Sequence, residues 1–453
     1  MKTELHYYDI FPKVVPSERE TQITIKPLGW HAAFPPACKL NICPLDEGRS
    51  SDYPGLANVF TYDVSPDADG CIRFRFSFFG EQQFYVRIAS ETGFSVQLSV
   101  YVVKDDLVGR YPYRGDTHMH SRRSDGKEAP AIVCANYRRI GYDFLAITDH
   151  YRYYPSIEAI ETFRGVPIEM ELIPGEEVHL PKDRSTGRIN DVHIVNFGGE
   201  YSVNALVESE YSAELVDKPR AIIDNIPPII SLSEYQAQVA KYMERLKVPG
   251  TAWAFAYASC CWIFDRIREA DGLGIFCHPY WINDVFQVPR KLLEYMMETH
   301  PFDAFEVLGG EIYFEQNGFQ TIQYYDDRAK GLGYPVVGAT DAHGSVNNPN
   351  SRICSSIVFS KQNERRALIS AIKDRYSVAV DSRSEYHDYV GEPQLARYAC
   401  FLEQEYFPLH DELCFEEGRA MKDYACGIPG ARETLEHIYG RVQAQREKYF
   451  AFD

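Results

Sequence analysis

Two stretches in the first hundred residues alternate apolar and polar side chains with a period of two. In the first, apolar residues at positions 72, 74, 76 and 78 alternate with Arg73, Arg75 and Ser77. In the second, apolar residues at even positions from Phe94 to Val102 do the same. This period is typical of half-buried β-strands. Turn-forming residues at 66–70 and 91–93 separate the runs. We therefore expect a small antiparallel β-sandwich over residues 1–108.

The pattern changes near residue 105, after which short apolar runs alternate with helical periodicity. A helix is predicted over 129–140, and strands are predicted at 116–120, 144–148, 171–173, 193–197, 274–277, 304–307 and 336–339. Repeating βα units of this length indicate a closed or nearly closed parallel barrel over 109–380. In such a barrel the active site lies where the strands end.

An insertion at about 201–271 interrupts these units with a helical pattern. Helices are predicted at 233–246 and 253–270, and prolines at 227, 228 and 249 break the pattern around them. A segment of this kind over a barrel mouth is a candidate lid or substrate wall. After residue 352 we expect one more strand, a helix at 364–373, a short strand at 377–380 and a helical tail over 381–453.

Histidines and acids gather at the predicted strand ends. His118 and His120 are two positions apart, so on a strand they share a face and can reach one metal ion. Asp125 follows in a Ser-Asp-Gly turn that can bring a carboxylate back to the same place. His150 closes the strand at 144–148, with Asp149 as an acceptor that could fix an imidazole.

The later strand ends continue this series. Glu177 follows the strand at 171–173, with Glu176 as the alternative carboxylate; the others are His193, His278, Asp341 and His343. Each residue alone is more easily explained as a turn residue or a satisfied core histidine. Together, nitrogen and oxygen donors at successive strand ends suit two or three ions of Zn²⁺, Mn²⁺ or Fe²⁺.

These motifs, in this order over roughly 109–380, resemble the polymerase-and-histidinol-phosphatase (PHP) family of metal-dependent phosphoesterases. They are Gly-Asp-x-His-x-His-Ser, Ser-Asp-Gly, Thr-Asp-His, Gly-x-Glu-Val, Val-His-Ile, His-Pro and Asp-x-His. The resemblance implies an α/β fold, a distorted seven-stranded (β/α) barrel with two or three metal ions. The β-rich leader before it is similar to the carbaryl-hydrolase-like branch of the family.

The resemblance also implies three ligand sets. The first is His118, His120, Glu177 and Asp341; the second is Glu177, His193 and His278; the third is Asp125, His150 and His343. Asp125 stands where some members have histidine. In these sets Glu177 is a bridging carboxylate between two ions.

The expected function is hydrolysis of a small phosphate mono- or diester by a hydroxide that bridges two ions, with Glu177 and Asp341 central to catalysis. The alternative is a hydrolase of carbamate, amide or carboxylic esters with the same metal centre. A third hypothesis is a non-catalytic, metal-stabilised binding protein whose partner contacts the β domain.

Several other residues flank the predicted ligands. Arg122 and Arg152 suit bidentate phosphate binding, although solvated surface charge remains the alternative, as it does for Arg123. His179, two positions after Glu177, is a candidate proton shuttle or substrate contact. Weaker candidates are Lys182 and Arg184 for phosphate, and Tyr280 and Trp281 for stacking on a leaving group, with packing as the default for the two aromatic residues.

Composition limits the partners. The 453 residues carry a formal net charge of −18, which argues against broad binding to nucleic acid or anionic membranes. No run of about eighteen apolar residues and no signal-type leader occurs, so we expect a cytoplasmic protein with a small-molecule substrate. The 11 cysteines form no CxxC pair and are read as reduced thiols.

Overall fold

The computed structural model describes residues 2–46, 59–211, 215, 217–309, 314–345, 354–382 and 387–452. The chain divides into two compact units. The first unit comprises Met1–Tyr111, Arg397–Leu413 and Gly440–Asp453, and the second comprises Pro112–Ala396 and Cys414–Tyr439. The residues predicted as a helical tail are therefore shared between the two units.

The first unit contains two sheets around one apolar core. The strand orders are β1-β3-β6 and β2-β8-β7-β4-β5, and all pairs are antiparallel except β2 with β8. The strands are β1 Tyr8–Phe11, β2 Val14–Pro16, β3 Glu20–Pro27, β4 Cys38–Pro44, β5 Phe60–Val64, β6 Ile72–Ser77, β7 Gln83–Ala89 and β8 Ser95–Val103, after a 3-10 helix η1 at Thr3–His6.

The alternating runs of the sequence account for these strands. In β6, Ile72 and Phe76 are buried while Arg73 and Arg75 are exposed. The core includes residues of both sheets, among them Ile23 from β3. Each sheet thus buries one face against the other, as the period of two predicts.

The second unit contains a six-stranded sheet and a five-stranded sheet. Their orders are β11-β10-β9-β19-β20-β21 and β12-β13-β14-β17-β18, and a hairpin joins β15 to β16. The strands are β9 Tyr111–Asp116, β10 Phe144–Ala146, β11 Glu171–Ile173, β12 Gly175–Val178, β13 Ile194–Phe197, β14 Leu273–Phe276, β15 Ile282–Asn283, β16 Val285–Phe286, β17 Ala304–Leu308, β18 Val336–Gly338, β19 Cys354–Ser360, β20 Ser377–Asp381 and β21 Asp388–Gly391.

The strand directions differ in part from the predicted parallel arrangement. β9, β10 and β11 are parallel, as are β14, β17 and β18. β13 is antiparallel to both β12 and β14, because β12 and β13 are joined by a loop and not by a crossover helix. The architecture is mixed α/β, and a closed seven-stranded barrel is not found among the described strands.

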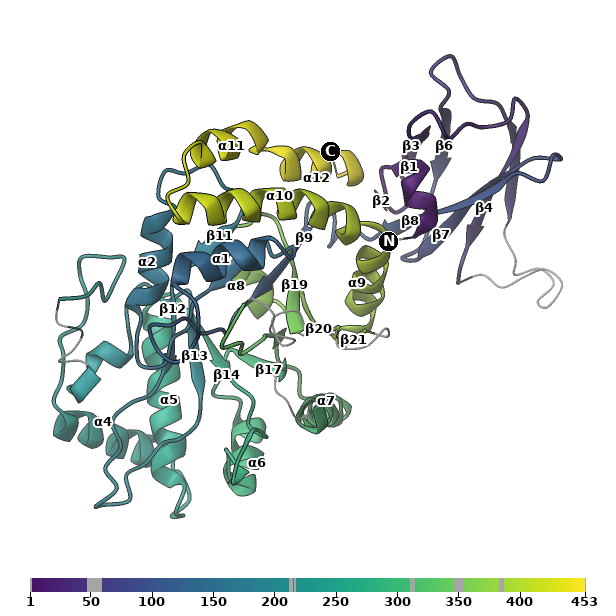
Figure 1. Ribbon diagram of the computed structural model, residues 1–453. Coiled ribbons are helices and arrows are strands. Elements are labelled where there is room, and N and C mark those ends of the chain that lie inside the picture. Colours follow the sequence, from purple (N-terminus) through teal and green to yellow (C-terminus); the bar gives the residue numbers. More distant parts are fainter. Residues whose placement is uncertain are drawn as a thin grey trace. The chain divides into compact units, whose positions relative to one another are not determined.

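Helices cover the outside of the second unit's strands, as Figure 1 shows for α1, α2, α5, α6 and α7. The α-helices are α1 Pro130–Arg138, α2 Tyr154–Thr162, α4 Leu232–Arg245, α5 Ala254–Glu269, α6 Arg290–Thr299, α7 Phe314–Ala329, α8 Arg365–Lys373, α9 Pro393–Glu405, α10 Phe407–Ala425, α11 Ala431–Ile438 and α12 Arg441–Tyr449, with a short 3-10 helix η2 at Asn204–Leu206.

The insertion contains the helices that its pattern predicts. α4 begins with a capping box, in which the Ser231 hydroxyl accepts from the Glu234 amide and the Glu234 carboxylate accepts from the Ser231 amide. α5 follows after Pro249. Residues 212–214 and 216 of the predicted insertion lie outside the described residues.

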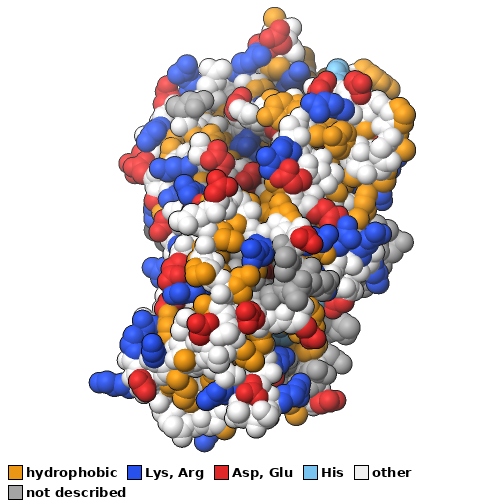
Figure 2. All heavy atoms as spheres, turned by 90° about the vertical axis from the view of Figure 1, so that its left-hand side faces the viewer, with side chains coloured by type: hydrophobic (Ala, Val, Ile, Leu, Met, Phe, Trp, Pro, Cys, Tyr) orange, Lys and Arg blue, Asp and Glu red, His pale blue; other side chains and the backbone are white. Residues whose placement is uncertain are grey.

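Charged side chains of both signs lie on the surface (Figure 2). Figure 2 shows Lys and Arg side chains interspersed with Asp and Glu over one face of the molecule. None of the helices within the described residues combines the length and the hydropathy that crossing a bilayer requires.

Candidate metal centre

The predicted donor residues lie in chain segments that directly follow or precede strands. β9 ends at Asp116, earlier than the predicted strand at 116–120, and a bend at Thr117 leads into His118 and His120. Met119 forms an isolated parallel bridge with Ala342. The His120 amide donates to Ala342 O at 3.0 Å, and the Asp341 amide donates to His118 O at 2.8 Å. This pairing places both His-x-His imidazoles beside Asp341.

A second bridge joins His150 to Glu177. The Glu177 amide donates to Thr148 O at 3.1 Å, and the Tyr151 amide donates to Glu177 O at 3.2 Å. The end of β10 is thus attached to β12. The two bridges thus join the segments that follow β9 and β10, neighbouring strands of the six-stranded sheet, to β12 and to the segment after β18, the two edge strands of the five-stranded sheet.

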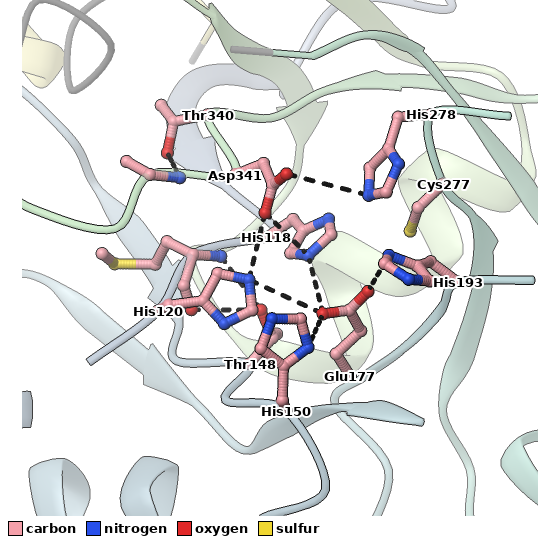
Figure 3. A network of polar contacts seen from close by, with 12 residues as sticks. His118, His120, Thr148, His150, Glu177, His193, Cys277, His278, Thr340 and Asp341 are labelled. Atoms are coloured by element: carbon pink, nitrogen blue, oxygen red, sulfur yellow. Dashed lines mark hydrogen bonds and ion pairs between the residues drawn. The ribbon is translucent and has the colours of Figure 1, made fainter. Parts of the chain in front are cut away.

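Glu177 is the centre of the donor groups (Figure 3). It is fully buried, and imidazole nitrogens surround its carboxylate on several sides. The distances are 2.7 Å to His150 Nδ1, 2.7 Å to His193 Nδ1, 3.4 Å to His179 Nε2, and 3.6 Å to Nε2 of both His118 and His120. One carboxylate therefore faces donors from four separate chain segments.

Asp341 is a second acidic group of the same pocket. Its Oδ1 lies 3.0 Å from His120 Nε2 and 3.3 Å from His118 Nε2, and its Oδ2 lies 3.8 Å from His278 Nε2. Both Asp341, with φ +46°, and His278, with φ +22°, have left-handed backbone conformations. Such conformations are strained in non-glycine residues and concentrate at functional sites.

A more exposed cluster surrounds Asp125. Its Oδ2 lies 3.4 Å from His150 Nε2 and 3.4 Å from His343 Nε2, and its Oδ1 lies 4.0 Å from His120 Nδ1. The Asp125 side chain is 54% exposed, whereas His118 and His120 are fully buried. The three donor clusters therefore extend from the interior to the surface.

The donor set fits divalent ions. Both Glu177 oxygens, His118 Nε2 and both His278 ring nitrogens are buried and have no hydrogen-bond partner among the described residues. Buried polar atoms are otherwise almost always paired, since leaving one unpaired costs about 1–3 kcal/mol. Ligand atoms of His118, His120 and Glu177 lie within 4.8 Å of one another, as do those of His120, Asp125, His150 and His343. Nitrogen and oxygen ligands at this spacing suit Zn²⁺, Mn²⁺ or Fe²⁺.

Burial and opposite charge shift the pKa values of these groups in different directions. Burial alone would raise the pKa of Glu177, but the surrounding imidazoles, led by His193, hold it well below its usual value. Burial lowers the pKa of His120 and of His179 to about 4, which favours neutral imidazoles. Burial alone would lower the pKa of His150, yet the negative charge of Glu177 raises the pKa of His150 to about 10. The carboxylate is thus ionised and two of its neighbouring imidazoles are neutral, which are the forms that bind metal.

Three buried carboxylates stabilise the loops that carry the donors. Asp116 accepts from the amides of His118 and Thr340, each at 3.1 Å, and from the Thr340 hydroxyl at 2.5 Å. It therefore joins the segment after β9 to the segment after β18. Burial raises the pKa of Asp116 to about 7.

Asp149 and Glu176 have roles that differ from those predicted. Asp149 accepts from the amides of Ser121 and Ser124, each at 3.0 Å, and from the Ser121 hydroxyl at 2.6 Å. It therefore orders the turn and does not contact an imidazole among its described hydrogen bonds. This arrangement also gives Ser121 and Ser124 structural roles.

Glu176 points away from the metal pocket, because successive side chains of β12 alternate between faces. It accepts from Asn196 Nδ2 at 3.1 Å, from the Ser202 hydroxyl at 2.6 Å and from Asn204 Nδ2 at 3.0 Å. The alternative carboxylate of the prediction thus anchors the start of the insertion.

Two of the cationic side chains that were predicted to bind phosphate form ion pairs with other acids. Arg123 forms a bidentate ion pair with Glu158 at 2.8 Å. Lys182 pairs with Asp191. Arg122 and Arg184 are exposed, and no described side-chain contact joins either to the donor groups. Arg123 and Lys182 are thus paired with acids outside the donor groups, and a role for Arg122 or Arg184 stays a prediction.

Arg152 and two tyrosines form a series of contacts that reaches His179. The Arg152 guanidinium lies 5.6 Å from the Tyr211 ring centroid, and Tyr211 stacks on Tyr151 at 4.0 Å. The Tyr151 ring lies 4.8 Å from the ring of His179. Trp281 approaches from another segment, with its ring 5.9 Å from that of His193.

Sequence reasoning missed Glu306. It lies in the buried strand β17, and its Oε2 is 2.9 Å from His118 Nδ1. The available signal was a charged residue in an otherwise apolar run, since a fully buried carboxylate needs a partner.

No protein-family model and no curated protein matches the chain. Among solved structures, it is similar to a two-domain protein from Bacteroides vulgatus that contains a predicted PHP-like metal-dependent phosphoesterase. That structure is 15% identical, the match covers 65% of this chain and 71% of that chain, and the TM-score is 0.40. The chain is also similar to an amidohydrolase from Chromobacterium violaceum with bound sulfate, at 19% identity, 51% and 87% coverage and a TM-score of 0.30.

Proposed function

We propose that this protein is a metal-dependent hydrolase of small phosphate mono- or diesters. The observation that carries the proposal is Glu177: a fully buried carboxylate, without a hydrogen-bond partner among the described residues, that several imidazoles approach within 3.6 Å. A buried anion in this setting is stable only when cations are nearby.

Three groups of residues would hold the ions. His118, His120, Glu177 and Asp341 form the first group, and Glu177, His193 and His278 form the second. Asp125, His150 and His343 form the third, which is the most exposed. Because Glu177 directs Oε2 at His118 and His120 of the first group and Oε1 at His193 of the second, it would be shared between the two groups.

Divalent ions held there would supply a water of lowered pKa and would offset negative charge on the oxygens of an ester. The chain's own residues orient and protect the site. His118 and His120 are fully buried, and the lowered pKa of His120 leaves a nitrogen lone pair of its ring for an ion. His179 lies 2.9 Å from His150 and 3.4 Å from Glu177, close enough to exchange a proton with the pocket.

The phosphate preference rests on the donor set and on Arg152. The alternative, a carbamate, amide or carboxylic ester hydrolase, is favoured by one observation. The other cations predicted to bind phosphate are paired or exposed, which leaves little fixed positive charge beside the pocket apart from Arg152 and the ions.

We also propose that seven strands form the barrel that holds this site. Pairing links β12, β13, β14, β17 and β18, and also β9 with β10. The single bridges Met119–Ala342 and His150–Glu177 join these two sets at their ends. These two bridges support a distorted barrel in which the two sets of strands are joined by single bridges beside the donor groups.

The test compares substrates on one preparation. The protein is loaded with Mn²⁺ or Zn²⁺ and assayed with p-nitrophenyl phosphate, bis-p-nitrophenyl phosphate and naphthyl carbamates. Release of phosphate or of nitrophenol from the phosphate esters supports the proposal, and release of naphthol alone favours the alternative. Absence of turnover on all of them, with ions bound, would leave the non-catalytic binding protein as the better explanation.

A further inference from the structure

Glu306 is a charged side chain inside an apolar strand. All five residues of β17, Ala304–Leu308, are buried, and Glu306 has no exposed surface. Its described side-chain partner is His118, with Oε2 and Nδ1 2.9 Å apart. A carboxylate is costly to bury unless it is paired, so this contact accounts for the presence of a glutamate here.

The contact favours one tautomer of the neutral His118 ring. A neutral imidazole has one N–H donor and one acceptor nitrogen. When Nδ1–H donates to Glu306, the lone pair is on Nε2, which faces Asp341 Oδ1 at 3.3 Å and Glu177 Oε2 at 3.6 Å. The nitrogen directed at the donor cluster is therefore the one that is free to bind an ion.

The strand that carries Glu306 is itself held in place. Buried Gln320 of α7 donates from Nε2 to the backbone oxygens of Glu306 and Val307, at 3.2 Å and 3.0 Å. His343 offers a comparison, because its Nδ1 contacts a neutral acceptor, the backbone oxygen of Asp341, at 3.0 Å. His118 instead has a charged acceptor, which makes its ring a stronger metal ligand.

We propose that Glu306 is a positioning residue that holds His118 in the tautomer and orientation needed to bind an ion. This inference rests on the metal centre proposed above. It predicts that Glu306 acts through His118 and contacts neither the ion nor the substrate.

The experiment measures metal binding, not only turnover. Ion stoichiometry and Zn²⁺ affinity are determined by chelator competition for the wild type, Glu306→Ala and the isosteric Glu306→Gln. Glu171→Gln, on the edge strand β11, is the matched control. We expect the affinity to fall about 10- to 100-fold in Glu306→Ala, with a smaller loss in Glu306→Gln, because the amide oxygen can still accept from Nδ1.

A nuclear magnetic resonance measurement separates this role from general destabilisation. The His118 Nδ1 proton should resonate far downfield in the wild type and lose that shift in Glu306→Ala, while Glu171→Gln keeps it. If Glu306→Ala fails to fold, Glu306→Gln gives the same test.

The outcomes distinguish the two proposals. A wild type that binds no ion would overturn the metal centre itself. Wild-type affinity in both Glu306 variants, with ions bound, would overturn the role of Glu306 alone. Loss of exactly one ion from the stoichiometry would make Glu306 a direct ligand and would also overturn the positioning role.

Discussion

Single residues of the pocket differ in how replaceable they are. His118 is fully buried and contacts three acids, Glu177, Asp341 and Glu306, within 3.6 Å. His343, by contrast, is 39% exposed and has Asp125 as its acidic side-chain neighbour. Removal of the buried imidazole therefore affects more of the pocket than removal of the exposed one.

We expect His118→Ala to lower both metal content and turnover, the latter by more than about 100-fold, because loss of an indirect contact already costs 10- to 100-fold. Elemental analysis and steady-state kinetics measure the two effects. His437→Ala, at an exposed position on α11, is the control and should behave as the wild type. Unchanged metal content in His118→Ala would remove His118 from the ligand set.

Glu171 gives a pH-dependent contribution to stability. Burial raises its pKa to about 7, against about 4.3 in an unfolded chain. Between these values the folded protein binds more protons than the unfolded chain, so the free energy of unfolding falls as the pH rises. After allowance for partial exposure, the contribution is on the order of 1 kcal/mol.

Glu171→Gln should flatten this dependence between about pH 5 and pH 8. Urea unfolding at the two pH values measures it, with Glu433→Gln on the exposed face of α11 as the control. An equal fall in stability for the wild type and Glu171→Gln would contradict the assignment.

Sequence reasoning predicted residues at the ends of apolar runs, and it missed a residue inside such a run. The predicted donors are polar residues at the ends of apolar runs, where side chains meet across a sheet edge. Glu306 lies within such a run, and a contact between residues 118 and 306 depends on tertiary packing. Asp149 is next to a predicted donor, but its partners Ser121 and Ser124 come from another loop.

At the scale of elements, hydrophobic periodicity predicted strands and helices better than strand direction. The predicted helix at 233–246 is α4, Leu232–Arg245, and the strand at 171–173 is β11, Glu171–Ile173. The antiparallel direction of β13 was not predicted, because a buried strand has the same apolar run in either direction.

Two helical glycines differ in the space around them, so we expect alanine to change the stability in opposite directions at the two positions. A Cβ at Gly418 of α10 would lie 2.3 Å from Arg139 N and 2.6 Å from Ala135 O, whereas a Cβ at Gly318 of α7 would meet no atom within 4 Å. Gly418→Ala should therefore destabilise the protein by about 1–3 kcal/mol. Gly318→Ala should stabilise it by up to about 1 kcal/mol, because alanine loses less entropy in a helix.

Denaturant unfolding of both variants measures the difference, and each variant is the control for the other. A stability gain in Gly418→Ala would show that α10 does not pack closely against α1.

At the scale of the whole molecule, ion binding and folding are linked. Ions that bind only the folded state stabilise it by about 2.7 kcal/mol when present at 100 times their dissociation constant. A chelator should therefore lower the melting temperature of the wild type, and it should lower that of His118→Ala by less. Differential scanning fluorimetry with and without the chelator measures both. Equal melting temperatures for the wild type under the two conditions would contradict the linkage.

The division of the chain into two compact units also affects how the melting curves are interpreted. The donor residues all belong to the second unit, while the N-terminal sheets and the C-terminal helix α12 belong to the first. We expect two transitions if the units unfold separately, with only one of them sensitive to the chelator.

Asp116, Asp149 and Glu176 attach the donor loops to their neighbours through amide and hydroxyl groups, and not through the side chains that would bind ions. The donor loops can therefore keep their arrangement when one ion is exchanged for another. The same ligand side chains could then accept any of several divalent ions, and the ion bound would depend on which of them is available.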